Sequence, residues 1–276
     1  MERSRRRACR PDRGTGASHN VVRLGSSRQP LRRGGPEIVA RRLRRFARLS
    51  EADERLLLGL VDWRHEPAGA ELIRDGHPNP PRVLVSGWAA RVRWTADGRR
   101  QIVGFALPGD GLALARRPQP LAVCPMVSLT PVQTLDAEPL LAALQSLPAD
   151  APLSHSLNVA AAVDEAWLIE QVVRLGRRSA YERVAHLVLE MHCRLSAIDQ
   201  VKNGMMSFPL TQEMLADATG LSIVHVNRTL QQLRREQFLE LHHGRLTILN
   251  EAALIALSGF VEPQPGTWTT YRSCWA

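Results

Sequence analysis

Two short helical patterns separated by one glycine constrain this chain more than any other feature of its sequence. Thr211 opens the first pattern with a hydroxyl suited to capping, and Gly220 closes it after about two turns. Ser222 is suited to cap a second helix at 223–235. Two short helices joined through a glycine-containing turn predict a helix-turn-helix, whose second helix presents its first residues to base edges in the major groove of DNA.

The apolar residues of both helices separate an inward side from an outward side. Leu215 and Ala218 are spaced to face inward on the first helix. Val226, Leu230 and Leu233 form the inward stripe of the second helix. Apolar groups on the outward side suit thymine methyls, an asparagine suits adenine, and an arginine suits guanine or a phosphate. The candidate DNA-binding residues are therefore the two caps and the outward residues that start the second helix: Thr211, Ser222, Ile223, Val224, His225, Asn227 and Arg228.

Further elements surround this pair of helices. Strand patterns at 238–241 and 245–249 flank His242-His-Gly244 and predict a two-stranded wing. Upstream, Ser179-Ala-Tyr-Glu182 is a capping-box sequence that opens a helix with one apolar face, formed by Val184, Leu187, Val188, Met191 and Leu195. Gly176-Arg-Arg178 breaks the preceding pattern and is a candidate hinge. We expect one domain at 177–251 and a C-terminal tail at 252–276.

One long helix is predicted at residues 149–176. Apolar side chains recur every three or four residues along it, in a narrow seam that Asp164 interrupts: Leu153, Leu157, Ala160, Trp167, Val172 and Leu175. A seam of this width is typical of a contact between two helices. We expect dimerisation through this seam, with packing inside the chain as the alternative.

The first half of the chain predicts a small antiparallel β domain at 38–148. Its first residues, 38–60, indicate one or two short helices, the second opened by Ser50-Glu-Ala-Asp53 as a capping box. Beyond Trp63, short apolar runs alternate with glycine-containing turns about every ten residues. This spacing is typical of successive strands.

The clearest hairpin signal in this β domain is Asp97-Gly98. It predicts a type I′ turn, because strand-like residues flank it at 91–94 and 101–103. Further strands are expected at 121–123 and 127–135.

The positive charge of the chain is concentrated near its N-terminus. The net charge is +9, yet residues 1–48 carry 15 arginines against three acidic residues, so the remainder is slightly acidic. Residues 1–37 are rich in Arg, Gly and Ser and have little apolar periodicity, which predicts a disordered tail. Two interpretations remain open: the tail contacts DNA non-specifically, or the start site is mis-assigned.

The four cysteines stand far apart, with no Cys-x-x-Cys pair, so we expect reduced thiols and no zinc or iron–sulfur site. His186, Glu190 and Cys193 can share one helical face. Without a fourth ligand nearby, we interpret them as ordinary helix residues rather than a metal site. A redox switch at Cys193 is the less favoured alternative. With neither a signal-peptide core nor an apolar run of about 18 residues, the sequence predicts a cytoplasmic protein.

A series of short motifs extends the pattern across residues 49–249. In the β domain they are Gly87-Trp-Ala-Ala-Arg91, Asp97-Gly-Arg-Arg-Gln-Ile102 and Leu107-Pro-Gly-Asp110. Beyond the long helix they are Arg177-Arg-Ser179, Glu182-Arg-Val-Ala-His186 and Leu221-Ser-Ile-Val-His-Val-Asn-Arg228. In this order they resemble the Crp/Fnr superfamily of bacterial transcription regulators, in its His-Val-Asn-Arg subgroup.

The resemblance implies an α+β chain with three parts: a cyclic-nucleotide-binding-like β-roll, a long dimerisation helix and a C-terminal winged helix-turn-helix. It implies a homodimer that binds a palindromic operator, with RNA polymerase as a further partner. It also implies that Gln212 approaches a phosphate and that Ile223, Val224 and Arg228 occupy the main reading positions. Ile223 and Val224 replace the polar or acidic residues usual there, so the familiar half-site sequence is not carried over.

The sensor segment departs from the cyclic-nucleotide binders of that family. Those proteins carry Gly-Glu and then Arg-Ser or Arg-Thr after Pro-Gly-Asp, to hold the ribose and the phosphate. Here no Glu follows Asp110 in that segment, and only Arg116 or Arg117 is placed to meet an anion. We therefore expect no cyclic nucleotide and no cofactor, and the effector stays open. Cys9 stands alone, so the cysteine cluster of Fnr-type oxygen sensors is missing as well.

Two other classes of function compete with a DNA-binding regulator. An enzyme would need a catalytic motif, and the sequence has no Gly-x-Ser-x-Gly, phosphate-loop or His-Glu-x-x-His pattern. A protein-interaction module with a winged helix that no longer binds DNA is the stronger alternative, because residues 211–250 carry four arginines against four acidic residues. Salt-dependent binding to a palindromic duplex would separate this module from a regulator.

Overall fold

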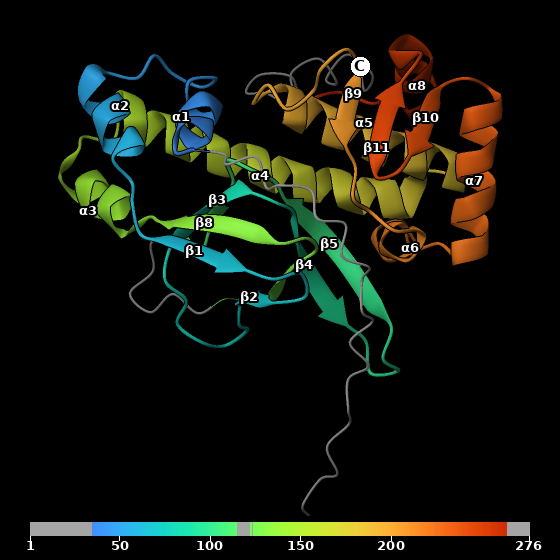
Figure 1. The fold of residues 1–276 in the computed structure, drawn as a ribbon, viewed down its shortest axis with the longest axis horizontal. Coiled ribbons are helices and arrows are strands. Elements are labelled where there is room, and N and C mark those ends of the chain that lie inside the picture. Colours follow the sequence, from blue (N-terminus) through green and yellow to red (C-terminus); the bar gives the residue numbers. More distant parts are fainter. Residues whose placement is uncertain (1–34, 115–121, 123, 264–276) are drawn as a thin grey trace, which may run out of the picture. The chain divides into compact units, whose positions relative to one another are not determined.

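The described elements begin with two short helices, which are followed by strands β1 to β8, one short and one long helix, and a C-terminal part of helices and short strands (Figure 1). The structure, a computed structural model, describes residues 35–114, 122 and 124–263, and all of these lie in one compact unit. Within these ranges, no helix combines the length and the apolar character needed to span a membrane. The tail predicted at 1–37 falls outside the described residues up to residue 34, and Glu37 already belongs to a helix.

Antiparallel sheets form the predicted β domain, which we call the β-roll. Among the described residues, one sheet has the strand order β1-β8-β3-β6 and another has the order β2-β7-β4-β5. Val85 of the first sheet and Ile102 of the second are fully buried in the same core. Gly87 has a φ of 82° between β3 and β4, where a Cβ would lie 2.3 Å from the Pro131 carbonyl oxygen. The strands are β1 (Trp63–Glu66), β2 (Glu71–Ile73), β3 (Arg82–Ser86), β4 (Ala89–Trp94), β5 (Arg100–Ala106), β6 (Gly111–Leu112), β7 (Met126–Ser128) and β8 (Val132–Asp136).

The hairpin of β4 and β5 forms where it was predicted, but with another turn. A type I′ turn requires a positive φ at both central residues. Of Asp97 and Gly98, only Gly98 has one, at 82°. The loop instead closes through the Gly98 N–H, which donates to the Thr95 carbonyl at 2.9 Å, and the Thr95 N–H, which donates to the Arg99 carbonyl at 2.9 Å. One glycine in the left-handed region is therefore enough for this longer loop.

Two other strand predictions change. The strand expected at 121–123 lies largely outside the described residues, because residues 121 and 123 are not among them. The segment expected as a strand at 127–135 is divided into β7 and β8, with no strand at 129–131.

Short helices flank the β-roll: α1 (Glu37–Leu43), α2 (Glu51–Leu58) and α3 (Glu138–Ser146). The capping box that opens α2 is confirmed, since the Asp53 N–H donates to the Ser50 hydroxyl at 3.2 Å and the Ser50 N–H donates to the Asp53 carboxylate at 2.9 Å. Helix α3 was not predicted from the sequence. Its Leu140 is fully buried in the main core, so tertiary packing stabilises this helix.

Helix α4 (Pro152–Arg177) is the predicted long helix, but most of its predicted seam packs inside its own chain. Leu153 and Ala160 lie in the main core, and Trp167 stacks on Phe260 with ring centroids 6.1 Å apart. The assignment of these residues to a contact between subunits was therefore wrong, and the alternative of packing inside the chain applies to them. Val172 of the predicted seam is exposed instead, on a face of α4 that it shares with Leu168, Ile169 and Val173.

The C-terminal part differs from its prediction at the wing and at the end of the chain. The predicted two-stranded wing has a third strand, in the order β10-β11-β9, and Met205 and Met206 belong to it. A helix begins at Glu251, where a tail was expected, and its Leu254 is fully buried. The elements are α5 (Ala180–Ser196), β9 (Met205–Ser207), α6 (Gln212–Thr219), α7 (Ile223–Arg235), β10 (Leu239–His242), β11 (Arg245–Ile248) and α8 (Glu251–Ser258).

Candidate nucleic-acid interface

Local capping builds the helix-turn-helix of α6 and α7. The Thr211 hydroxyl accepts from the Met214 N–H at 3.1 Å, and the Ser222 hydroxyl accepts from the His225 N–H at 3.2 Å. Gly220 ends α6 with a φ of 66°, a left-handed conformation that glycine adopts without steric cost. Both predicted caps and the predicted turn are confirmed.

The inward sides of the two helices pack as their spacing predicted. Leu215 and Ala218 of α6 are buried, as are Val226, Leu230 and Leu233 of α7. Burying several aliphatic side chains in this way contributes about 1.5–3 kcal/mol for each one. Helices α6 and α7 also contact each other, so they form one packed unit.

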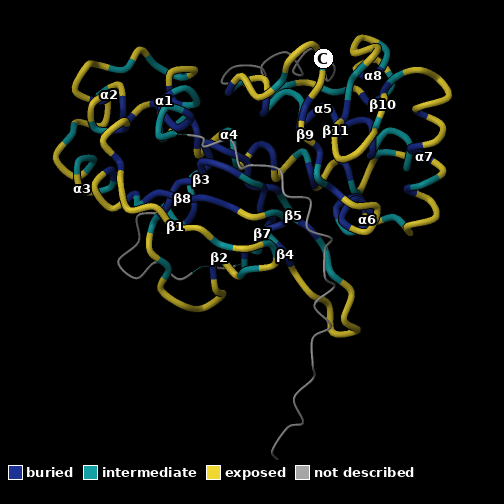
Figure 2. Tube along the Cα trace, in the orientation of Figure 1, coloured by how far each residue is buried: buried dark blue, intermediate teal, exposed yellow. Residues whose placement is uncertain are grey.

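The outward side of α7 starts with a group of accessible side chains. Ile223 is 50% exposed and Val224 is 62% exposed. His225 and Arg228 are exposed as well, whereas Asn227 is half-buried (Figure 2). Among the described residues, the Arg228 guanidinium has no hydrogen-bond or ion-pair partner, so it is available to a ligand.

The remaining predicted contacts lie at the starts of the two helices. Thr211 and Gln212 are exposed at the N-terminus of α6, and Ser222 is exposed at the N-terminus of α7. The unpaired N–H groups of a helix N-terminus favour an anion such as a phosphate. The fold thus places all eight predicted site residues on the two helices of one module.

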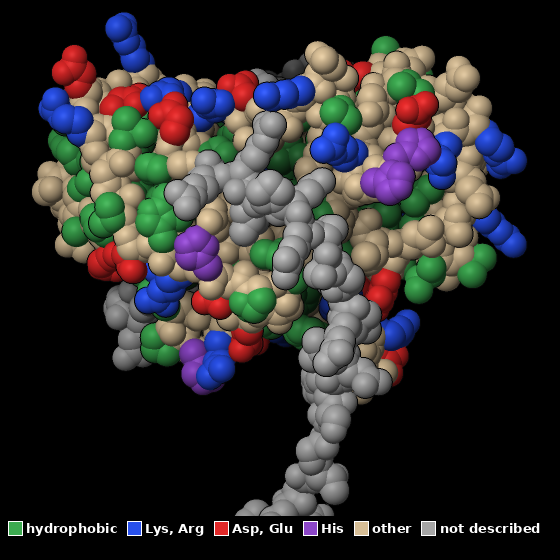
Figure 3. Space-filling model, viewed as in Figure 1, with side chains coloured by type: hydrophobic (Ala, Val, Ile, Leu, Met, Phe, Trp, Pro, Cys, Tyr) green, Lys and Arg blue, Asp and Glu red, His purple; other side chains and the backbone are tan. Residues whose placement is uncertain are grey.

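Further accessible cations lie on this module and were not predicted as site residues. Arg234 and Arg235 end α7, and Arg245 begins β11 beside the exposed wing turn at 242–244. Figure 3 shows Lys and Arg side chains along the outer edge formed by α7, with histidine side chains over β10 and β11. The exposed turn of the wing was the sequence signal that could have indicated Arg245.

Residues 211–250 carry equal numbers of arginines and acidic residues, but some of the acidic groups are bonded to other parts of the chain. Asp217 forms an ion pair with Arg100 of β5 at 2.6 Å, and burial raises the pKa of its carboxyl group against the lowering effect of Arg100. Glu236 accepts a hydrogen bond from the Tyr181 hydroxyl, which lowers the pKa of Glu236. Two of the four acidic groups are thus bonded to other parts of the chain.

A cavity of about 910 Å³ lies between the β-roll and helices α3 and α4. Its lining is largely apolar, with Val83 from the roll, Leu144 from α3 and Leu157 from α4. The described β-roll residues that line it include the Arg91 guanidinium but no carboxylate that would hold a ribose. Arg116 and Arg117, the predicted alternative anion contacts, lie outside the described residues.

His186 and Glu190 of α5 both contact the Arg174 guanidinium, whereas Cys193 lies beside Glu262. The His186 Nδ1 accepts from the Arg174 guanidinium at 3.2 Å, whereas Glu190 accepts from Arg194 at 3.1 Å. Burial raises the pKa of the Cys193 thiol, and the carboxylate of Glu262 raises it further. The described residues contain no group of three His, Cys, Asp or Glu side chains placed to hold a metal ion.

The β-roll, the long helix α4 and the winged helix-turn-helix together define a class of DNA-binding protein. In this class a β domain is joined to a winged helix-turn-helix domain, which we call the reading head. A model of the Crp-like helix-turn-helix domain matches residues 182–257, which extend into helix α8. The solved structure of FixK2 from Bradyrhizobium japonicum has a TM-score of 0.62 and 24% identity, and the match covers 72% of this chain and 98% of that one.

Relatives with assigned roles give the family. The nitrogen fixation regulation protein FixK of Bradyrhizobium diazoefficiens is 32% identical over 162 residues, which are 59% of this chain and 67% of that protein. The transcriptional activatory protein AadR of Rhodopseudomonas palustris is 29% identical over 195 residues, 71% of this chain and 80% of that protein. This chain belongs to the Crp/Fnr superfamily, as its motifs predicted, and is a DNA-binding transcription regulator rather than an enzyme. The comparisons give no support to the alternative of a protein-interaction module.

Proposed function

We propose that this regulator binds a palindromic operator as a homodimer, with the start of α7 in the major groove of each half-site. The observation that supports this most is the accessible outward side of α7 directly after the Ser222 cap. Ile223 and Val224 are exposed apolar groups suited to thymine methyls, and Arg228 is suited to guanine. A contact that covers these adjacent exposed apolar side chains removes their surface from water and is favourable.

The proposal assigns a role to each site residue. Base edges are contacted by Ile223, Val224, His225, Asn227 and Arg228, because these side chains lie outward in the first turns of α7. Phosphates are contacted at the helix starts by Thr211, Gln212 and Ser222. Contacts of the first kind give sequence specificity, and those of the second kind give position on the duplex.

The direct test is Arg228→Ala, measured as affinity for an operator selected by the parent protein from random palindromes. A bidentate contact to guanine is worth about 1–3 kcal/mol in each half-site, so the dimer should lose about twice that. Arg55→Ala removes an exposed arginine of α2 and is the control for charge alone. Operator binding that matches the parent in Arg228→Ala would remove this side chain from the interface.

The homodimer rests on the exposed apolar face of α4. Leu168, Ile169, Val172 and Val173 repeat at spacings of three and four residues, which keeps them on one side of the helix. Val172 is 70% exposed, an unusual degree for a valine in a long helix. A second copy of α4 in a coiled-coil contact would cover these side chains.

Sedimentation of Val172→Asp tests this interface. The parent should sediment as a dimer at micromolar concentration and the variant as a monomer, because an aspartate would lose its hydration in the contact. Val61→Asp is the matched control, since Val61 is 68% exposed outside α4. A monomeric parent would contradict the dimer outright.

We extend the proposal to RNA polymerase as a partner. The support is that AadR, 29% identical to this chain, is described as a transcriptional activatory protein. Transcription with purified polymerase from a template that carries the selected operator measures the effect, and a regulator that changes no transcript from any operator position would contradict it.

A further inference from the structure

The C-terminus of α6 is capped by three other elements of the chain. The last carbonyls of a helix have no partner within it and are commonly left to water. Here Gln101 Nε2 of β5 donates to the Asp217 carbonyl at 2.6 Å, and Gln171 Nε2 of α4 donates to the Ala218 carbonyl at 2.7 Å. Arg183 of α5 donates to the Thr219 carbonyl at 3.1 Å. Three successive carbonyls of α6 are thus held by other elements, and two of these elements, β5 and α4, lie outside the winged helix-turn-helix domain.

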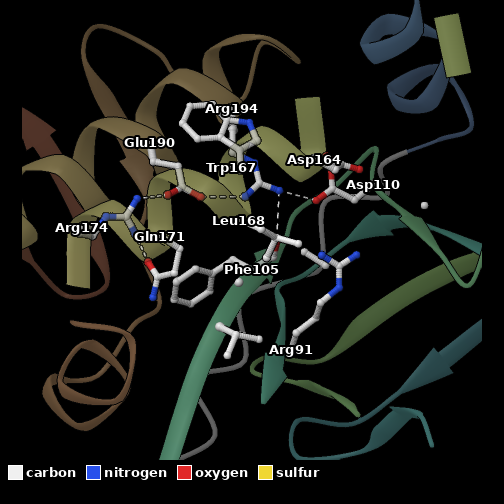
Figure 4. A pocket seen from close by; sticks show the side chains of 14 residues that line it. Arg91, Phe105, Asp110, Asp164, Trp167, Leu168, Gln171, Arg174, Glu190 and Arg194 are labelled. Atoms are coloured by element: carbon white, nitrogen blue, oxygen red, sulfur yellow. Dashed lines mark hydrogen bonds and ion pairs between the residues drawn. The ribbon is translucent and has the colours of Figure 1, made fainter. Parts of the chain in front are cut away.

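The Gln171 contact continues into a buried polar chain that reaches the β-roll (Figure 4). Arg174 donates to the Gln171 side-chain oxygen at 2.5 Å and pairs with Glu190. Glu190 accepts from Arg194 at 3.1 Å, and Arg194 donates to the Asp110 carboxylate at 2.6 Å. Asp110 belongs to the Leu107-Pro-Gly-Asp110 turn, so this series of polar contacts connects that turn with α6.

Burial makes this polar chain a rigid support. Gln171 is 7% exposed, Arg174 is 1% exposed and Glu190 is 4% exposed. Breaking a link would leave a buried charge or amide with one partner fewer, which is unfavourable. Because α6 and α7 are packed against each other, holding α6 in place also sets the direction of α7.

We propose that Gln171 and Gln101 are positioning residues for operator binding, because they hold α6 by its last carbonyls at a fixed orientation to α4 and the β-roll. This inference rests on the proposed binding of a palindrome by a homodimer. Gln171 is adjacent to Val172 of the exposed α4 face, so one helix contacts the partner on one side and the reading head on another. The distance between the two reading heads is then set by where Gln171 lies on α4 relative to the contact with the partner.

A positioning role differs from a stabilising role in its dependence on half-site spacing. A dimer with fixed reading heads matches half-sites about one helical turn apart and loses affinity when the spacing changes. A dimer with freed reading heads binds each spacing with similar, weaker affinity, because the orientation must be selected at binding. A dimer that is merely less stable binds all spacings less well by the same factor.

Gln171→Glu is the variant that tests the contact most selectively. It keeps an oxygen for Arg174 and removes the NH2 group that donates to the carbonyls of Ala218 and Ile102. Gln101→Glu makes the same change at a half-buried position of β5 and guards against misfolding of the first variant. Gln200→Glu is the matched control, because Gln200 is exposed at the end of α5 and carries the same change of charge.

The measurement is the affinity of each full-length dimer for the selected operator and for palindromes with the half-sites moved apart or together by a base pair or two. In Gln171→Glu and Gln101→Glu, we expect affinity for the best spacing to fall about tenfold, because each freed reading head must be ordered at binding. We also expect the preference among spacings to flatten. Gln200→Glu should match the parent in both.

Two results would overturn the proposal. One is a spacing profile in both variants that keeps the shape of the parent profile, whatever the absolute affinity. The other is tighter binding in either variant, which would mean that the contact holds the reading head away from DNA. A parent protein that shows no preference for palindromes contradicts the proposed function instead, so the two failures are distinct.

Discussion

Replacing Glu190 with glutamine should destabilise this protein far more than an equal change at its surface. The Glu190 side chain is 5% exposed and pairs with Arg174, which is 1% exposed, and with Arg194, which is 11% exposed. Removing one partner of a buried ion pair costs about 3–5 kcal/mol, because the other charge stays buried. Arg174 keeps Gln171 and Arg194 keeps Asp110, so we expect the lower end, about 3 kcal/mol.

The assay is thermal unfolding at one fixed protein concentration, since a dimer gains stability with concentration. For a domain of this size, about 3 kcal/mol corresponds to a fall in melting temperature of about 6–12 °C. Glu54→Gln is the matched control, because Glu54 pairs with Arg44 at the surface and should lose less than about 1 kcal/mol. Equal melting temperatures for the two variants would refute the reasoning and show that Arg174 and Arg194 are solvated or paired elsewhere.

Three further predictions follow from burial and charge. Val226→Asp should unfold the helix-turn-helix, because Val226 is fully buried, while Val224→Asp at a 62% exposed position should leave the melt unchanged. Calorimetry with cyclic AMP and cyclic GMP should show no binding, because no described β-roll residue that lines the cavity supplies a carboxylate for a ribose. Micromolar affinity for either nucleotide would contradict this expectation. Burial lowers the pKa of His186 against the raising effect of Glu170, so the unfolded chain takes up a proton below about pH 6.5 while folded His186 takes it up only at lower pH. Its contribution to stability is therefore present above that pH and is lost as the pH falls, and His186→Gln should lose less stability than the parent between about pH 7.5 and 5.5.

The sequence by itself determined the features that depend on neighbours along the chain. The caps at Ser50, Ser179, Thr211 and Ser222 and the left-handed Gly220 are local, because each involves atoms only a few residues apart. Helical spacing also identified the inward residues of α6 and α7. These features carry the helix-turn-helix, and for this reason the candidate site was accessible to sequence reasoning.

Tertiary structure decided which surfaces meet. The periodicity of α4 predicted a seam but not its partner: most of the seam packs against this chain's own core, while its residue Val172 is exposed with its neighbours. Strand β9 and helix α8 are short segments that pair or pack with distant residues, and their own spacing carries no signal for that. Gln101 and Gln171 reach carbonyls of α6 from 116 and 47 residues away. Only the folded chain brings such donors and acceptors together, because a hydrogen bond between distant segments has no period or spacing in the sequence.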